Sequence, residues 1–135
     1  MTQAEILVPG GQASGAALVF SAPISFWGGV DPKTGRVVDV RHPQHGDCIA
    51  GRVLFLPGTI GSSSASAVLL ELVHADRAPA AIVLHEPDAI LLLGLIVARE
   101  MGWETPPALK LDRAFHDALK DKFVTIAAGG NIDFE

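Results

Sequence analysis

The sequence is poor in cysteine, in charged residues and in long apolar runs. Its single cysteine, Cys48, excludes an internal disulfide. Charged residues make up 19% of the chain, the net charge is −5, and no basic run occurs, so nucleic-acid binding is not expected. The longest dense apolar stretch, Ala89 to Ala98, is interrupted by Gly94 and is too short to span a bilayer. We therefore expect a buried helix there and no membrane segment.

Two further absences concern metals and export. The five histidines are scattered, and His42 and His45 have no carboxylate or cysteine partner nearby in the sequence, so a metal site built from them is not expected. The N-terminus has no basic region followed by an apolar run, because Glu5 intervenes. A cytoplasmic location is the resulting expectation.

Several common catalytic and nucleotide-binding motifs are also missing. The segment from Gly58 to Ser64 contains no lysine where a P-loop requires one, and it lacks the G-x-S-x-G form of a nucleophile elbow. The glycines between Gly10 and Gly15 precede another strand instead of a helix, so they cannot form a dinucleotide-binding turn. A serine hydrolase and a nucleotide-binding protein are therefore disfavoured.

What the sequence does contain is enough apolar material for one domain, which we expect to span residues 1–135. Hydrophobic residues make up 49% of its 135 residues, and the mean hydropathy is +0.36. A chain of this length buries an ordinary core without disulfides or metal. The composition is more apolar than a free-standing domain usually needs. Some of this apolar surface is therefore expected to meet a partner.

The first half of the chain indicates strands and turns. Residues 4–8 and 16–20 read as strands joined by a glycine-rich loop, which predicts an antiparallel pair at the beginning. The five residues Asp31 to Gly35 suit a tight turn, with Asp31 capping it through backbone hydrogen bonds. Short strands are expected on either side, at residues 37–40 and 49–56.

The second half alternates helices with strands, which is typical of a mixed sheet in a three-layer or barrel-like α/β domain. The apolar spacing and the turn residues place the elements as follows. We expect helices at 63–75, 88–101 and 113–120, and strands at 80–85, 109–111 and 123–127.

The small-residue loop from Pro57 to Ser66 is the best candidate for chemistry. It lies between an apolar strand and an amphipathic helix, so its serines fall where the helix begins. Backbone N–H groups and the positive end of the helix dipole stabilise negative charge there, on a bound carboxylate or phosphate or on a serine oxygen that loses its proton. The alternative is a serine that only caps the helix.

The segment from Ser25 to Asp31 combines two large aromatic residues with two glycines. In one interpretation Phe26 and Trp27 fill the core while the glycines make a bend. In the other, exposed aromatic side chains anchor a partner chain beside an active site. The sequence leaves both open.

Three segments, in this order and spacing, resemble the small subunit, or swivel domain, of the aconitase X family. The resemblance covers nearly the whole chain. The segments are Pro23-Ile24-Ser25-Phe26-Trp27-Gly28-Gly29-Val30-Asp31-Pro32-x-Thr34-Gly35, Gly51-Arg52-Val53-Leu54-Phe55-Leu56-Pro57-Gly58-x-x-Gly61-Ser62 and Ala78-Pro79-Ala80-Ala81-Ile82.

This resemblance implies a swivelling β/β/α domain, a barrel-like mixed sheet flanked by helices as in the aconitase swivel domain. It implies that the domain closes over a large subunit that holds an iron–sulfur cluster. One cysteine agrees with that division, because a cluster usually takes three or four thiolates. In such an enzyme iron acts as a Lewis acid toward the leaving hydroxyl.

The family's known activities are dehydrations of small hydroxy-carboxylates. Bacterial members include cis-3-hydroxy-L-proline dehydratase, which gives a pyrroline-2-carboxylate, and archaeal members include phosphomevalonate dehydratase. The serine loop has no lysine or arginine, which a phosphate ester usually attracts, so the hydroxyproline substrate is favoured and phosphomevalonate is the alternative. A non-catalytic interaction module is an alternative of another class.

In related enzymes a serine of this domain removes the proton α to the substrate carboxylate. By position that residue is Ser62 here, with Gly61, Ser63 and Ser64 as substrate-binding residues. Archaeal members have glycine-serine where this chain has Ala65-Ser66. Which of the serines from 62 to 66 faces the site therefore stays open. Arg52, at the start of the preceding strand, is expected to pair with a surface acid more readily than to bind substrate.

Overall fold

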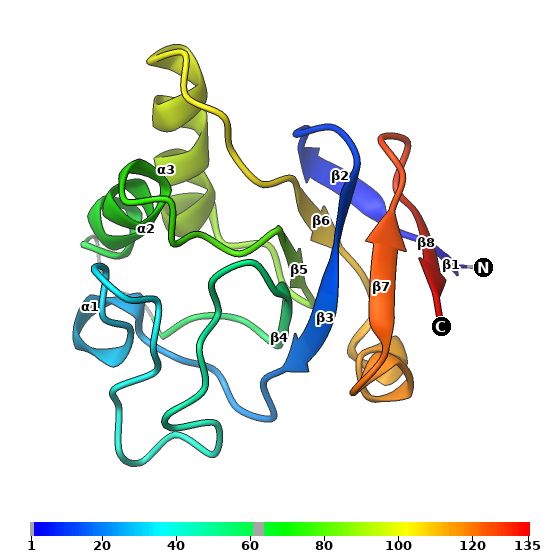
Figure 1. Ribbon diagram of the computed structural model, residues 1–135, viewed down its shortest axis with the longest axis horizontal. Coiled ribbons are helices and arrows are strands. Elements are labelled where there is room, and N and C mark those ends of the chain that lie inside the picture. Colours follow the sequence, from blue (N-terminus) through cyan, green and yellow to red (C-terminus); the bar gives the residue numbers. More distant parts are fainter. Residues whose placement is uncertain (1, 61–63) are drawn as a thin grey trace.

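The computed structural model describes residues 2–60 and 64–135, and it forms a strongly curved sheet with two long helices on one side (Figure 1). The strands are β1 (Thr2–Gln3), β2 (Glu5–Val8), β3 (Ala13–Val19), β4 (Val53–Leu56), β5 (Ala81–Leu84), β6 (Ala108–Lys110), β7 (Phe123–Ile126) and β8 (Asn131–Phe134). The helices are α1 (Phe26–Gly29), α2 (Ala65–His74) and α3 (Ala89–Glu100), with two short 3-10 helices, Arg113–Phe115 and Asp117–Leu119. No helix in the described ranges is long and apolar enough to cross a membrane.

The eight strands form a nearly closed barrel. Their hydrogen-bonded order is β1-β8-β7-β3-β4-β5-β6-β2. The first and last strands of this order, β1 and β2, are consecutive in the chain and are separated only by Ala4. The Ala4 amide donates to the Gly130 carbonyl at 2.9 Å, which fixes the corner where the chain passes from one edge to the other. The expected barrel-like mixed sheet is confirmed.

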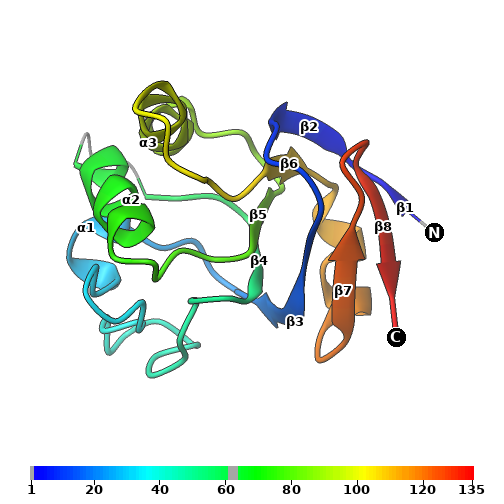
Figure 2. The same ribbon diagram turned by 45° about the horizontal axis from the view of Figure 1, so that its top comes forward.

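Four neighbouring strands run parallel, and their connections bring the helices to the outside of the barrel. Strand β3 pairs with β4, β4 with β5 and β5 with β6, all in parallel. Helix α2 links β4 to β5 and helix α3 links β5 to β6, and both lie on the same side of the sheet, opposite β7 and β8 (Figures 1 and 2). This arrangement places the carboxyl ends of all four parallel strands at one end of the barrel.

The parallel strands are buried on both faces, which explains their uninterrupted apolar sequences. In β4, Val53 and Phe55 belong to the cluster inside the barrel, whereas Leu54 and Leu56 belong to the cluster between the barrel and the helices. Strand β5 divides its side chains between the two clusters in the same way. The two cores therefore share the same strands.

Close packing of α2 against α3 depends on a glycine. A Cβ atom built on Gly94 would lie 2.7 Å from the Ser66 carbonyl oxygen and 3.2 Å from the Ser66 Cα atom. The residues of α3 that face inward are Leu91, Gly94, Leu95 and Ala98, at the spacing of one helix face. Gly94 thus lets α3 approach the first turn of α2, which directly follows the serine loop.

The structure corrects the predicted beginning of the fold. Strands β2 and β3 do not pair with each other: β2 is antiparallel to β6, and the first half of β3 is antiparallel to β7. Residues 37–40 form no strand and contribute only the isolated bridge of Val37 with Val30. The strand expected at 49–56 begins at Val53. The helix expected at 113–120 is two 3-10 turns.

The expected turn at Asp31 to Gly35 is confirmed. The Asp31 carbonyl accepts a hydrogen bond from the Gly35 amide at 2.8 Å, and Gly35 adopts a φ of 80°. The Asp31 carboxylate caps the turn by accepting from the Lys33 amide at 2.9 Å. Asp31 is therefore occupied structurally, as the sequence indicated.

His116 is one of the buried histidines of the described residues, and it contacts the cluster inside the barrel. The exposed fraction of His116 is 2%, its Nε2 atom lies 3.0 Å from the Leu111 carbonyl, and its ring packs edge-on against Phe55. Because the carbonyl only accepts, Nε2 carries the proton. Burial lowers the pKa of His116 below 6.5, and the positive charges of His85 and Arg113 lower it further, against the opposing hydrogen bond to Leu111 and the charge of Asp117.

This shift predicts a stability that depends on pH. The unfolded chain binds a proton at His116 more readily than the folded chain does, so the free energy of unfolding is highest above pH 6.5. It falls as the pH drops through 6.5 toward the lower folded pKa. Urea unfolding at pH 7.5 and pH 5.5 checks this, and His116→Gln should reduce the difference. The exposed His45→Gln serves as the control. Equal pH dependence in wild type and His116→Gln would contradict the prediction.

Candidate functional site

A hollow opens where the carboxyl ends of β4 and β5 separate. The two strands stay hydrogen-bonded just beyond their ends, with the His85 amide donating to the Leu56 carbonyl at 3.1 Å and the Glu86 amide to the Pro57 carbonyl at 3.2 Å. Beyond these bonds the segments diverge. The resulting hollow has a volume of about 320 Å³ and is lined by Gly58, Thr59, Glu86, Pro87, Asp88, Ala89 and Ile90. Carboxyl ends of parallel strands are common ligand sites.

Three polar side chains line the hollow, those of Thr59, Glu86 and Asp88. The Thr59 hydroxyl oxygen is buried and has no hydrogen-bond partner in the described part of the chain. Glu86 is exposed. Asp88 is committed elsewhere, because its carboxylate caps α3 by accepting from the amides of Ile90 and Leu91 at 3.0 and 3.2 Å.

The segment before the serines is held by a neighbouring loop. Thr59 forms an isolated parallel bridge with Ile24, and the Ile60 amide donates to the Ile24 carbonyl at 3.0 Å. Ile24 belongs to the first of the three family-like segments and Thr59 to the second. The fold therefore brings these two sequence motifs into contact at the hollow.

Three of the four proposed site residues, Gly61, Ser62 and Ser63, lie outside the described residues. The fourth, Ser64, precedes α2 and has helical backbone angles, with φ −81° and ψ −7°. Its carbonyl accepts from the Val68 amide at 3.2 Å, but its side chain does not cap the first helical amides. The serine loop thus connects Ile60, beside the hollow, to the amino end of α2.

Phe26 and Trp27, the two aromatic residues of the segment from Ser25 to Asp31, differ in burial. Phe26 is fully buried in the core between the sheet and the helices, whereas 62% of Trp27 is exposed. Gly28, which follows both residues, makes a bend with a φ of 78°, and the Ser25 hydroxyl donates to the Trp27 carbonyl at 3.1 Å. Phe26 therefore fills the core, whereas Trp27 does not. Their short helix α1 lies beside α2 (Figure 1), and a role of Trp27 in anchoring a partner stays a prediction.

Arg52 is held by backbone and lies at the wrong end of the barrel for this site. Its Nε and Nη2 atoms donate to the carbonyls of Ala16 and Ala17 at 3.2 and 3.0 Å. It immediately precedes β4, at the opposite end of that strand from the hollow. The expected pairing with a surface acid is wrong, because carbonyls of β3 satisfy the guanidinium.

Two basic residues at the strand ends were not found from the sequence. His85 follows β5 and accepts from the Arg113 amide through Nδ1 at 3.0 Å, so its proton lies on Nε2. Arg113 follows β6, and its Nη2 atom donates to the Ser21 carbonyl at 2.9 Å. The sequence signal was their position at the end of one predicted strand and just after another, but their proximity requires the parallel order β5-β6.

A larger hollow of about 810 Å³ lies at the other end of β5. Its lining includes Ala80, just before that strand, together with Gly10, Arg99 and Trp103. Arg99 donates to the Pro9 carbonyl at 2.6 Å, and Trp103 packs against His74 with ring centroids 5.0 Å apart. This hollow is separate from the serine loop.

The described residues contain no group of three or more histidine, cysteine or acidic side chains placed to hold a metal ion. The sequence offers only Cys48, whose thiol donates to the Thr34 carbonyl at 3.3 Å. An iron–sulfur cluster usually takes three or four thiolates. The residues of this chain therefore do not fit such a cluster.

Comparisons with known proteins agree on one family. The sequence profile of the aconitase X swivel domain matches residues 1–133. Cis-3-hydroxy-L-proline dehydratase of Pseudomonas aeruginosa is 44% identical over 133 residues, which are 96% of this chain but 23% of that protein. The phosphomevalonate dehydratase small subunit of Methanothermobacter thermautotrophicus is 46% identical over 88 residues, which are 65% of this chain and 67% of that subunit.

A solved structure shows the same fold at full length. Aconitase X of Thermococcus kodakaraensis in its holo-form superposes with a TM-score of 0.84 at 29% identity, covering 100% of this chain and 99% of that one. The nearly closed barrel and the helices on one side define a β/β/α domain. This chain belongs to the aconitase X family, as its swivel domain. It spans about a quarter of the length of the Pseudomonas relative.

Proposed function

We propose that this chain is the small subunit of an aconitase X-type hydro-lyase that dehydrates cis-3-hydroxy-L-proline together with a large subunit. The observation that carries this proposal is the strand-end hollow at Gly58 and Thr59 together with the start of α2 at Ala65, the described segments on either side of the serine loop. The 44% identity to a cis-3-hydroxy-L-proline dehydratase over nearly the whole chain supports the choice of substrate. The proposal treats residues 1–135 as one domain, because the two cores share strands β4 and β5.

In this proposal Ser62 is the base that removes the proton α to the substrate carboxylate. The C–H electron pair forms the new double bond to the neighbouring carbon, and the hydroxyl on that carbon leaves with a proton as water. The enamine then tautomerises to a pyrroline-2-carboxylate. A serine alkoxide requires strong stabilisation at neutral pH, and donors at the start of a helix in a closed site provide it. Gly61, Ser63 and Ser64 are assigned to substrate binding.

The iron–sulfur cluster of the proposed enzyme is assigned to the large subunit. The single cysteine of this chain supports that assignment. The roles left to this chain are removing the proton, binding the substrate and excluding water. The hollow is open on its own, with Thr59 and Glu86 at its wall, so the partner is needed to complete it.

Phosphomevalonate is a second candidate substrate, and two observations favour it. The archaeal relatives are named small subunits and are separate chains. The match covers 67% of the Methanothermobacter subunit. In addition, His85 and Arg113 bring basic groups to the strand ends, which the serine loop itself lacks. Arginine suits phosphate recognition through its several donors.

The experiment is to purify this chain with the iron–sulfur large subunit of its own source and to offer both substrates. We expect the pair to convert cis-3-hydroxy-L-proline and the isolated chain to be inactive. Conversion of phosphomevalonate alone would select the second candidate. A complex that turns over neither substrate would favour the non-catalytic module, and turnover by the isolated chain would contradict the two-subunit proposal.

A further inference from the structure

The outer face of α3 is apolar although it faces solvent. Its exposed side chains recur at the spacing of one helix face and have exposed fractions between 38% and 52%. We call them the α3 stripe: Ile90, Leu93, Ile96, Val97 and Met101. Isolated exposed apolar residues are normal on a protein surface, but a contiguous set on one element marks an interaction site.

The rest of the helix pair shows that this composition is not needed for folding. Helix α3 has an inner face that is already buried, and from Ala89 to Ala98 it has no polar side chain on any face. The neighbouring helix α2 also buries an apolar face, but Glu71 and His74 are on its exposed side. The stripe therefore exceeds what packing within the chain requires.

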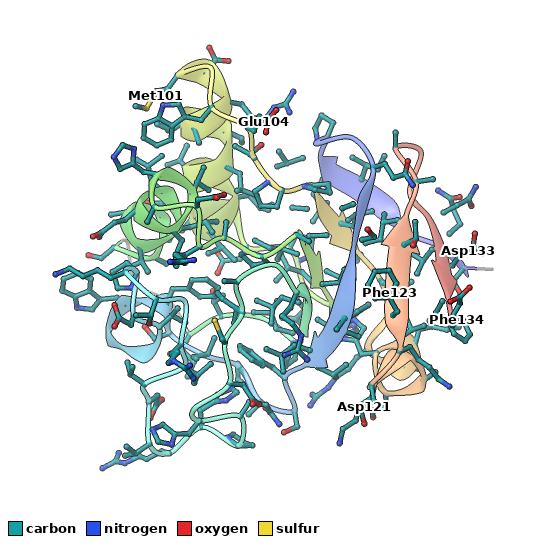
Figure 3. The ribbon with its side chains drawn as sticks, in the orientation of Figure 1. Met101, Glu104, Asp121, Phe123, Asp133 and Phe134 are labelled. Carbon is teal, nitrogen blue, oxygen red and sulfur yellow. The ribbon has the colours of Figure 1, made fainter. Side chains whose placement is uncertain are left out.

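The stripe is continuous with the candidate site. Its first residue, Ile90, lines the hollow beside Thr59 and Glu86. From there the stripe follows α3 to Met101 at the far end of the helix (Figure 3). A body that rests on the stripe therefore also reaches the opening of the hollow.

We propose that the α3 stripe is the docking surface for the large subunit, which meets it with a complementary apolar face. This inference rests on the proposed function. In the Pseudomonas relative the matched region is 23% of the protein, so there this domain is joined to a body more than three times its size. This small chain has an open site beside a long apolar stripe. Burying that stripe against such a body is more favourable than leaving it in contact with water. Docking along α3 would close the hollow.

The test measures binding of this chain to the large subunit by isothermal titration calorimetry. The double variant Leu93→Glu with Val97→Glu places two charges in the middle of the stripe. Because charges are excluded from interface centres and central residues carry most of the binding energy, we expect binding about 100-fold weaker or more. The matched control is Phe123→Glu on β7, whose exposed fraction of 53% is close to the 50% of Leu93. Phe123 lies on the far side of the barrel from α3 (Figure 3). The affinity of the Phe123→Glu chain for the large subunit should therefore stay within about threefold of the wild-type affinity.

Each other outcome is decisive. If the wild-type chain forms no complex with the large subunit, both the proposed function and this inference fail. If the wild type binds and the double variant binds equally well, only the inference fails. If the isolated chain sediments as a dimer and the double variant sediments as a monomer, the stripe binds a second copy of this chain instead of the large subunit. That result would overturn the inference.

A second measurement does not depend on the variants folding. The methyl NMR signals of Leu93 and Val97 in the wild-type chain should shift or broaden on adding the large subunit, whereas those of Val124, inside the barrel, should not. Unchanged stripe signals in a formed complex would overturn the inference.

Discussion

Replacing Ser62 by alanine is expected to reduce turnover by the assembled enzyme by about 10²–10⁴-fold, the range typical of losing a general base. The reason is that Ser62→Ala removes the only atom proposed to accept the α-proton, while it leaves the fold and the subunit interface intact. Steady-state turnover of cis-3-hydroxy-L-proline by the purified pair measures the effect. Calorimetry with the large subunit checks that assembly persists.

The neighbouring serines provide matched controls. Ser63→Ala and Ser64→Ala remove the same hydroxyl from residues proposed to bind substrate, so they should raise KM more than they lower kcat. If Ser64→Ala or Ser66→Ala abolishes turnover while Ser62→Ala leaves it unchanged, the base is a different serine of the loop. Full activity in all of these variants would contradict a serine base.

Replacing Gly94 by valine is expected to lower the stability of the chain. Its Cβ atom alone would lie 2.7 Å from the Ser66 carbonyl oxygen, so α3 and the first turn of α2 must move apart. Overpacking of this kind costs about 1–3 kcal/mol in the free energy of unfolding. Because the shifted turn directly follows the serine loop, activity of the pair should fall as well. Urea unfolding measures the first effect and turnover the second.

Gly129 provides the control for this substitution. No atom lies within 4 Å of a Cβ built there, so Gly129→Val should change the free energy of unfolding by about 0.5 kcal/mol or less. A Gly94→Val chain as stable and as active as the Gly129→Val chain would show that the close approach of the helices is dispensable.

The sequence predicted the two long helices, the buried parallel strands and the family well, because these depend on local patterns. Alternation of helix and strand after residue 60, the Asp31 turn and the three family segments are all readable along the chain. The family and the barrel-like α/β fold are confirmed. The roles of Gly61, Ser62, Ser63 and Ser64 stay predictions, as does the substrate.

The pairing of strands that are distant in the sequence could not be predicted from local patterns. The two opening strands looked like a hairpin because a glycine-rich loop joins them, yet each pairs with a strand more than 100 residues away. The same reason explains why Arg113 and His85 were missed, since they meet only through the parallel pairing of β5 with β6. Trp27 and Phe26 are adjacent aromatic residues, and only the tertiary packing around them decides that Phe26 is buried and Trp27 is exposed.

The most direct test of the serine base follows the substrate's α-hydrogen. The assembled enzyme is given cis-3-hydroxy-L-proline labelled with deuterium at the α-carbon, and loss of the label is measured over a single turnover. We predict that the wild-type pair removes the deuteron as water is eliminated, and that the Ser62→Ala pair binds the substrate but leaves the C–D bond intact. Cleavage of that bond by the Ser62→Ala pair at the wild-type rate would contradict the proposed role of this chain.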